Sequence, residues 1–291
     1  MRIWSDIDFG LALHHETKVY GDLLLKASPP SDLLGAIGCG FPLYLAHGRK
    51  VYLYSDREFD GVETGQPWCY EVQDVVRFYW YSGTSTIYYR LEKKGSATLL
   101  GFWFIHLFLP LYFTLENRYQ MFHGGAVTVE DISVMFMATS MGGKSTLTDY
   151  FIQKGHTLIS DDKIPTFLEE NRMMLVGAHP YHRPYRQFED LGYRVSQFIA
   201  HKTPLSVCYL LERADKEAAV EIEEVKGFEK FYKVLPHYLF SLPFLQKQRM
   251  YYLSQSLKNV EVFVVKIPWS LERLDEVYRS LTTHILRVKK V

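Results

Sequence analysis

Residues 123–162 read HGGAVTVEDISVMFMATSMGGKSTLTDYFIQKGHTLISDD, and this stretch decides how the rest of the chain is interpreted. It predicts an apolar strand at 132–137, a glycine-bearing loop, an amphipathic helix and a short second strand that ends in two aspartates. The loop, ATSMGGKST at 138–146, nearly matches the phosphate-binding pattern G-x-x-x-x-G-K-[ST], with Ala138 where the first glycine usually stands. An apolar strand before the loop and a helix-forming run after it favour nucleotide binding over the alternative, a glycine-rich turn with a solvated lysine.

The residues of this loop suit a phosphate for separate physical reasons. Successive backbone N–H groups and the positive end of the following helix surround phosphate oxygens. Glycines let the main chain come close and take positive φ. Lys144 is expected to reach the outer phosphates, and the Ser145 hydroxyl to ligate Mg²⁺. The predicted nucleotide-binding residues are Ser140, Met141, Gly142, Gly143, Lys144, Ser145 and Thr146.

Asp161 and Asp162 follow the second predicted strand. A strand that comes after a phosphate-loop helix can run beside the first strand, so that its carboxyl end opens into the same crevice. Two carboxylates there can divide the work. One accepts a proton from an attacking hydroxyl, while the other holds Mg²⁺ or a water in its shell. The alternative is a solvated Asp-Asp turn.

Three segments together resemble the HPr kinase/phosphorylase family: His123-Gly124, SMGGKST at 140–146 and KGHTLISDD at 154–162. They look most like the stand-alone kinases of that family found with lasso-peptide biosynthesis, which phosphorylate a serine of the precursor peptide. The resemblance covers residues 123–164 and is diffuse elsewhere. It implies a mixed α/β fold whose P-loop kinase core is akin to HPr kinase and phosphoenolpyruvate carboxykinase.

The same resemblance implies roles for individual residues. Asp161 would be the general base, Asp162 its partner at the metal, and His123 a neighbour of the reacting phosphate. ATP and Mg²⁺ would be the cofactors. Residues 188–192, FEDLG, only loosely match the family's EIRGLG signature, which implies Glu189 as a second metal-directed carboxylate. The mismatch puts the family's reverse, phosphorolytic reaction in doubt.

The proline-containing loop at 177–186, GAHPYHRPYR, supplies further candidates. Arg183 and Arg186 could clamp a phosphate or a peptide carboxylate with two hydrogen bonds each. A basic surface loop is the alternative. His179 and His182 have the spacing of zinc ligands, but no third ligand is evident in the sequence.

Two domains are expected. Residues 1–94 are rich in aromatic and β-branched runs, which predicts a β-rich N-terminal domain that could recognise the substrate. Residues 95–291 would form the catalytic domain. Residues 95–115 carry no formal charge and are long enough to span a bilayer. His106 and Pro110 in the middle favour instead a buried helix packed on the catalytic sheet, without membrane insertion.

Composition narrows the remaining possibilities. Lysine plus arginine and aspartate plus glutamate both number 33, so the net charge is zero and nothing favours nucleic acid as a partner. Three distant cysteines predict neither a disulfide framework nor a zinc site. With no signal-peptide pattern at the N-terminus, a cytoplasmic protein is expected.

The sequence therefore predicts a cytoplasmic ATP- and Mg²⁺-dependent kinase that transfers the γ-phosphate to a serine hydroxyl of a peptide, as in lasso-peptide precursor tailoring. Two alternatives stay open. One is a nucleotide hydrolase or nucleotide-gated binding module, and the other is a small-molecule kinase of the same fold. The acceptor peptide, the nucleotide preference and the oligomeric state, including a homo-oligomer, are not determined by the sequence.

Overall fold

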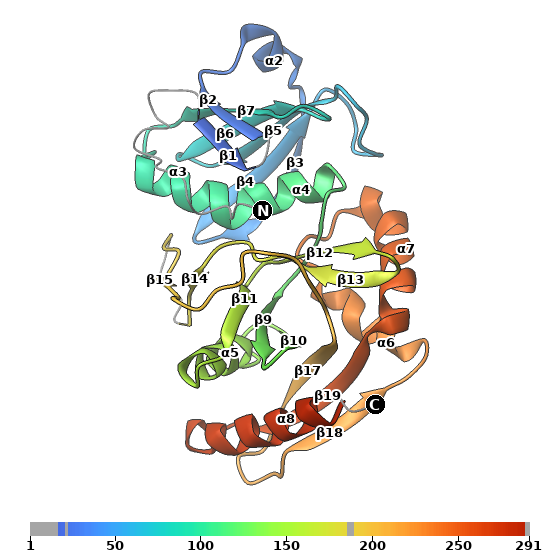
Figure 1. Ribbon diagram of the computed structural model, residues 1–291. Helices are drawn as coiled ribbons and strands as arrows, with labels where there is room; N and C mark the ends of the chain where they lie inside the picture. Colours follow the sequence, from blue (N-terminus) through green and yellow to red (C-terminus); the bar gives the residue numbers. More distant parts are fainter. Residues whose placement is uncertain (1–16, 21–22, 185–188, 289–291) are drawn as a thin grey trace. The chain divides into compact units, whose positions relative to one another are not determined.

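The computed structural model describes residues 17–20, 23–184 and 189–288, which group into two compact units. Unit 1 takes Met1–Tyr119 and Gln187–Leu191, and unit 2 takes Gln120–Arg186 and Gly192–Val291 (Figure 1). The division along the chain thus falls after Tyr119 and not after Lys94. The mixed α/β fold class is as predicted.

Unit 1 is built on a mostly antiparallel sheet with strand order β1-β2-β7-β6-β5-β4-β3. Only the β2–β7 pair within it is parallel. Aromatic and β-branched side chains fill these strands, as expected for a pleated surface with one buried face. The elements are β1 (Thr17–Tyr20), β2 (Leu23–Ala27), α2 (Ser31–Ala36), β3 (Cys39–Ala46), β4 (Arg49–Ser55), β5 (Pro67–Val72), β6 (Val76–Tyr81) and β7 (Thr86–Leu91).

The apolar stretch forms a continuous helix on this sheet, made of α3 (Ala97–Trp103), the π-helical turn η1 (Phe104–Phe108) and α4 (Leu109–Leu115). The π turn falls just before Pro110, which has no N–H to donate, so the regular hydrogen-bond ladder is interrupted there. Phe108 stacks on Phe78 of β6 with ring centroids 4.3 Å apart.

This helix belongs with the N-terminal sheet, which corrects the expectation that it packs in the catalytic domain. The physical reason is its aromatic face, whose rings interlock with those of β5 and β6. The segment Ala97–Leu115 has the length and hydropathy to cross a bilayer, yet 89% of its apolar window is buried inside the protein. Such burial is typical of a core helix.

Unit 2 is centred on a sheet with strand order β11-β9-β10-β17-β19-β18, in which β10, β17 and β19 are parallel. A smaller sheet has the order β16-β13-β12-β8. The elements are β8 (Gln120–Phe122), β9 (Gly124–Val129), β10 (Ile132–Met137), α5 (Lys144–Gln153), β11 (Thr157–Asp161), β12 (Ile164–Glu169), β13 (Arg172–Leu175), β14 (Tyr181–His182), β15 (Tyr193–Arg194), β16 (Thr203–Pro204), β17 (Val207–Ala214), β18 (Glu221–Val225), α6 (Glu229–Val234), η2 (Leu235–His237), η3 (Pro243–Leu245), α7 (Gln246–Ser256), η4 (Leu257–Asn259), β19 (Glu261–Pro268), η5 (Leu271–Arg273) and α8 (Leu274–Val288).

Both faces of the central sheet are covered. All six residues of β10 are buried, and its apolar side chains divide between two clusters, one on each face of the sheet. Val134 and Phe136 pack with α5 and α8, whereas Met135 and Met137 pack with α6 and α7. A strand buried on both faces reads as a continuous apolar run, which is why this strand could be recognised from the sequence. Figure 1 shows the two helix layers of unit 2.

Candidate active site

The phosphate loop has the backbone that its sequence requires. Gly143 has φ of 89° and directly precedes α5, and Met141 also has positive φ. A Cβ placed on Gly142 would lie 2.6 Å from the Cβ of Ala138. Because Ala138 carries the methyl group that a glycine would lack, position 142 has no room for another. The loop therefore keeps its fold with alanine at the first position, provided that Gly142 has no side chain.

The helix after the loop sits unusually close to the neighbouring strand. A Cβ on Gly125 of β9 would lie 2.1 Å from Oγ1 of Thr148, one turn into α5. The Thr148 hydroxyl in turn donates a 2.8 Å hydrogen bond to the carbonyl of Lys144. Glycine at position 125 thus lets α5 approach the sheet. Gly125 therefore has a packing role, which is separate from any chemical role of His123 two residues before it.

Strand register places the two aspartates and the start of the phosphate loop at the same end of the strands of the central sheet. Gly125 of β9 is paired with Phe136 of β10 on one side and with Asp161 of β11 on the other. Since β9 is antiparallel to both neighbours, β10 and β11 run in the same direction and end together. The expectation that β11 lies directly beside β10 needs correction, because β9 intervenes. Two strand spacings put the chains about 10 Å apart.

The carboxylate of Asp161 is buried and held from one side. Its Oδ2 accepts hydrogen bonds from Nδ1 of His182 (2.8 Å) and from the backbone N–H of Arg183 (3.2 Å). Within the described part of the chain, Oδ1 has no hydrogen-bond partner. A buried carboxylate oxygen left unpaired is costly and marks a place where a ligand or water is expected.

Asp162 lies among cations. Its Oδ2 pairs with Nζ of Lys163 and lies 3.5 Å from a guanidinium nitrogen of Arg183, and its Oδ1 lies 3.2 Å from Nδ1 of His123. Burial lowers the pKa of His123 to about 4, assisted by the positive charges of Lys144 and Lys163 and opposed by Asp162. His123 is therefore neutral at pH 7. Burial also lowers the pKa of Lys163.

His182 links the aspartate strand to the phosphate-loop helix. Its ring is fully buried, with Nδ1 on Asp161 and Nε2 3.3 Å from Oδ1 of Asp149 in α5, close enough for an ion pair but outside hydrogen-bond geometry. Burial acts to lower the pKa of His182, but the hydrogen bond and charge of Asp161 and the charge of Asp149 outweigh it and raise the pKa. Tyr193 fixes Asp149 through a 2.6 Å hydrogen bond.

His179 is buried beside the same aspartates, but its pKa is shifted in the opposite direction from that of His182. Neither of its ring nitrogens has a hydrogen-bond partner among the described residues, and burial lowers its pKa to about 4. His179 and His182 have the sequence spacing of zinc ligands, but the described residues place no third ligand beside them. No three His, Cys, Asp or Glu side chains in the described ranges are grouped to hold a metal ion.

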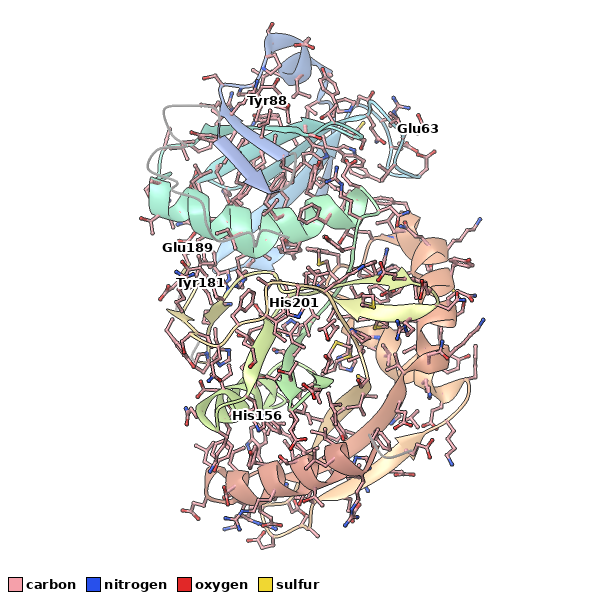
Figure 2. The ribbon with its side chains drawn as sticks, in the orientation of Figure 1. Glu63, Tyr88, His156, Tyr181, Glu189 and His201 are labelled. Carbon is pink, nitrogen blue, oxygen red and sulfur yellow. The ribbon has the colours of Figure 1, made fainter. Side chains whose placement is uncertain are left out.

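Two predicted residues are not placed in this cluster. Glu189, labelled in Figure 2, groups with unit 1, where its carboxylate pairs with Arg49 at 2.6 Å and accepts a 2.7 Å hydrogen bond from Nε1 of Trp103. Its two oxygens are thus already bonded, so its metal role stays a prediction without support here. Arg186 lies outside the described residues.

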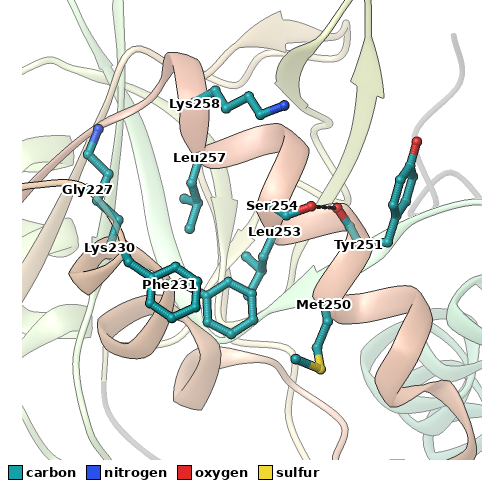
Figure 3. Close-up of a pocket in the computed structure, with 10 residues that line it drawn as sticks. Gly227, Lys230, Phe231, Met250, Tyr251, Leu253, Ser254, Leu257 and Lys258 are labelled. Carbon is teal, nitrogen blue, oxygen red and sulfur yellow. Dashed lines mark hydrogen bonds between the residues drawn. The ribbon is translucent and has the colours of Figure 1, made fainter.

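A cavity of about 690 Å³ lies between α6 and α7, lined mainly by apolar side chains such as Phe228, Phe231 and Met250 (Figure 3). Lys230 and Lys258 also line it. Their ammonium groups donate to the carbonyl of Val260 and to the side chain of Gln255. This hollow lacks grouped acids and cations, so its size does not make it the site of phosphate chemistry.

Comparison with known proteins supports the predicted family resemblance. No family model matches the chain. The HPr kinase/phosphorylase of Prosthecochloris aestuarii is 26% identical over 76 residues, which is 26% of this chain and 22% of that relative. The matched part therefore spans about a fifth of the relative's length. The solved Hpr(Ser) kinase/phosphatase of Coxiella burnetii aligns with 59% of this chain and 92% of its own, at 13% identity and a TM-score of 0.36. A TM-score this low carries no argument. The chain is thus similar in sequence to HPr kinase/phosphorylase.

Proposed function

We propose that unit 2 is an ATP- and Mg²⁺-dependent kinase that transfers the γ-phosphate to a serine hydroxyl of a peptide. The observation that carries the proposal is the unpaired Oδ1 of Asp161, buried at the end of β11 that lies level with the start of the phosphate loop. The similarity to HPr kinase/phosphorylase supports the same class of reaction.

In the proposed step, the acceptor hydroxyl donates a hydrogen bond to Oδ1 of Asp161. His182 and the N–H of Arg183 hold the other oxygen, which fixes the carboxylate plane before the acceptor arrives. The hydroxyl oxygen attacks the γ-phosphorus in line, its proton passes to Asp161, and the bond to the β-phosphate oxygen breaks. Lys144 offsets the charge on the transferring group, so positioning and electrostatics supply most of the rate.

To bind Mg²⁺, Asp162 would exchange its present contact with Lys163 or His123 for the ion. This ion is usually bound by one or two carboxylates, substrate phosphates and waters, so a preformed cage of protein ligands is not needed. Asp162 and the Ser145 hydroxyl would hold it, with the buried Oδ1 of Asp161 as a further oxygen nearby. When bound, Mg²⁺ would neutralise charge on the phosphates.

The acceptor class and the cellular setting are parts of the same proposal. The resemblance of the 123–162 stretch to the lasso-peptide kinases supports a peptide serine as acceptor. Arg183, whose guanidinium already lies near Asp162, could steer an acidic group of that peptide. Cys39, Cys69 and Cys208 are free thiols, which supports a reducing compartment such as the cytoplasm.

The test is a transfer assay with γ-labelled ATP and serine-containing candidate peptides. We expect label on the peptide, a loss of about 10³-fold in transfer rate for Asp161→Asn, and an unchanged rate for Asp60→Asn, an exposed aspartate of unit 1. ATP affinity of Asp161→Asn should stay within about tenfold, because the base acts on the acceptor. Label appearing only as free phosphate would favour a nucleotide hydrolase, and full transfer by Asp161→Asn would remove this residue from its role.

A further inference from the structure

A second cavity, of about 270 Å³, lies beside the first turn of α5. Gly143 and Thr146 of the phosphate loop line one side. The other side comes from the end of β19 and the start of α8, and includes Ile267, Trp269 and Leu274. The lining is mostly apolar, which distinguishes it from the charged cluster around Asp161.

This cavity and the aspartates lie on opposite sides of the phosphate-loop strand β10. In the strand order β11-β9-β10-β17-β19-β18, the phosphate-loop strand β10 lies between β11 and β19. Asp161 ends β11 and Asp162 follows it, on one side of β10, and the cavity adjoins the end of β19, on the other. Parallel strands β10, β17 and β19 end at one edge, where open α/β sheets bind ligands. A triphosphate along the loop, with its γ end toward the aspartates, would have its nucleoside end toward the cavity.

Trp269 is held at this cavity by contacts to the loop itself. The Arg213 guanidinium covers one face of the indole, 3.7 Å from its ring centroid, and also donates to the carbonyl of Met141. A Cβ on Gly143 would come within 3.1 Å of the indole ring, so the ring lies almost against the loop. Trp269 remains 47% exposed. With 47% of its surface exposed and part of it lining the cavity, the indole offers an aromatic surface on which a ligand could stack.

We propose that this cavity binds the purine base of the nucleoside triphosphate, stacked on the indole of Trp269. This inference rests on the proposed function and adds to it the way in which the nucleotide is recognised. Because the lining side chains are mostly apolar, stacking and burial supply the affinity, and adenine and guanine are bound with little discrimination. Base–aromatic stacking tolerates different bases because every base has a π face.

The experiment measures binding of ATP, GTP and inorganic tripolyphosphate, each with Mg²⁺, by titration calorimetry. For the full-length protein we expect ATP and GTP affinities within about tenfold of each other and both at least about tenfold tighter than tripolyphosphate. Trp269→Ala should weaken ATP binding about tenfold and leave tripolyphosphate binding within about twofold, whereas Trp269→Phe, which can still stack, should bind ATP within about threefold of the parent. Tyr232→Ala, which removes an exposed aromatic ring of α6, is the matched control and should change nothing.

The outcomes separate this inference from the kinase proposal. Tripolyphosphate binding as tight as ATP binding, or an equal loss of both in Trp269→Ala, would overturn the base site and leave the kinase proposal intact. Lys144→Met should weaken all three ligands, because it acts on phosphate. If none of the three ligands binds to the parent protein, the proposed function and the base site are both wrong.

Discussion

Two buried polar clusters, one in each unit, differ in how completely their hydrogen bonds are made. In unit 1, Ser55, Gln66 and Ser82 are buried and satisfied: Gln66 donates to Ser55, Ser55 to the carbonyl of Pro67, and Trp68 to Ser82. In unit 2, the acid cluster leaves Oδ1 of Asp161 and both nitrogens of His179 without partners among the described residues. A buried polar group normally finds a partner, and leaving it without one costs free energy.

This difference separates a scaffold from a site. Polar groups that only stabilise a fold can be satisfied within it, as Ser55, Gln66 and Ser82 are in unit 1. Groups that bind a ligand keep at least one hydrogen-bonding atom unpaired until the ligand arrives. The contrast predicts that substitutions at the unit 2 cluster change activity more than stability, and that substitutions at the unit 1 cluster do the reverse.

Among the tests of this contrast, the largest effect is expected at His182, which holds the proposed base. His182→Phe fills the space but cannot donate to Asp161, so the kcat of peptide transfer should fall about 10–100-fold, as is usual when a supporting partner is lost, while the KM for ATP stays constant. Steady-state kinetics give both constants. His182→Asn, whose amide can donate from a similar position, should recover part of the rate. Equal loss in both variants would indicate a packing role only.

A steric test of the helix position comes next. Gly125→Ala puts a methyl group against Thr148, and overpacking of this kind costs about 1–3 kcal/mol. Thermal unfolding should show the loss, and nucleotide affinity should weaken as α5 shifts. The double substitution Gly125→Ala with Thr148→Ala removes the opposing atoms and should recover part of the stability. If the double variant is no better than the single one, the close contact is not the cause.

The corresponding test in unit 1 removes Gln66, a buried side chain whose hydrogen bonds are made within the fold. Gln66→Ala leaves the N–H of Glu63 and the hydroxyl of Ser55 without their present partner, which should lower the free energy of unfolding by about 1–2 kcal/mol. The transfer rate per folded molecule should be unchanged. A lower rate at full folding would show that unit 1 takes part in the reaction more directly than the comparison supposes.

The smallest effect concerns pH. The pKa of His179 is about 4 in the folded protein and about 6.5 when exposed, so the unfolded state binds more protons between these values. Stability from this group is present above pH 6.5 and is lost as pH falls toward 4, by about 1 kcal/mol at pH 5.5. His179→Leu should flatten the change in melting temperature between pH 7 and 5.5. His201→Leu, at an exposed position, should leave the slope as it is.

Contiguous motifs could be predicted from the sequence, and tertiary partners could not. The loop at 138–146 and Asp161 and Asp162 each follow a short strand, and local pattern is enough to place such residues at strand ends. His182 and Asp149 meet only because β14 and α5 come together in space, and no spacing rule links positions so far apart. The same holds for Trp269 and Arg213, which belong to different strand ends.

Two errors of the sequence reading have a common physical origin. Its place directly before the catalytic half of the chain predicts that the apolar helix packs there, but its ring contacts are with β5 and β6. Likewise β11 was expected next to β10, although β9, which precedes β10, pairs with both. Order along the chain was taken as a guide to neighbours, whereas side-chain packing and strand pairing decide them.

The contact between Ala138 and Gly142 bears on how such loops are recognised in other sequences. The space between these two positions admits one methyl group but not two. A Cβ at the fifth position would also lie 2.9 Å from the carbonyl oxygen of Thr139, so that position needs glycine whichever residue stands first. A search that demands glycine at the first position overlooks chains like this one. A rule that allows a small side chain at the first position and keeps glycine at the fifth would find them.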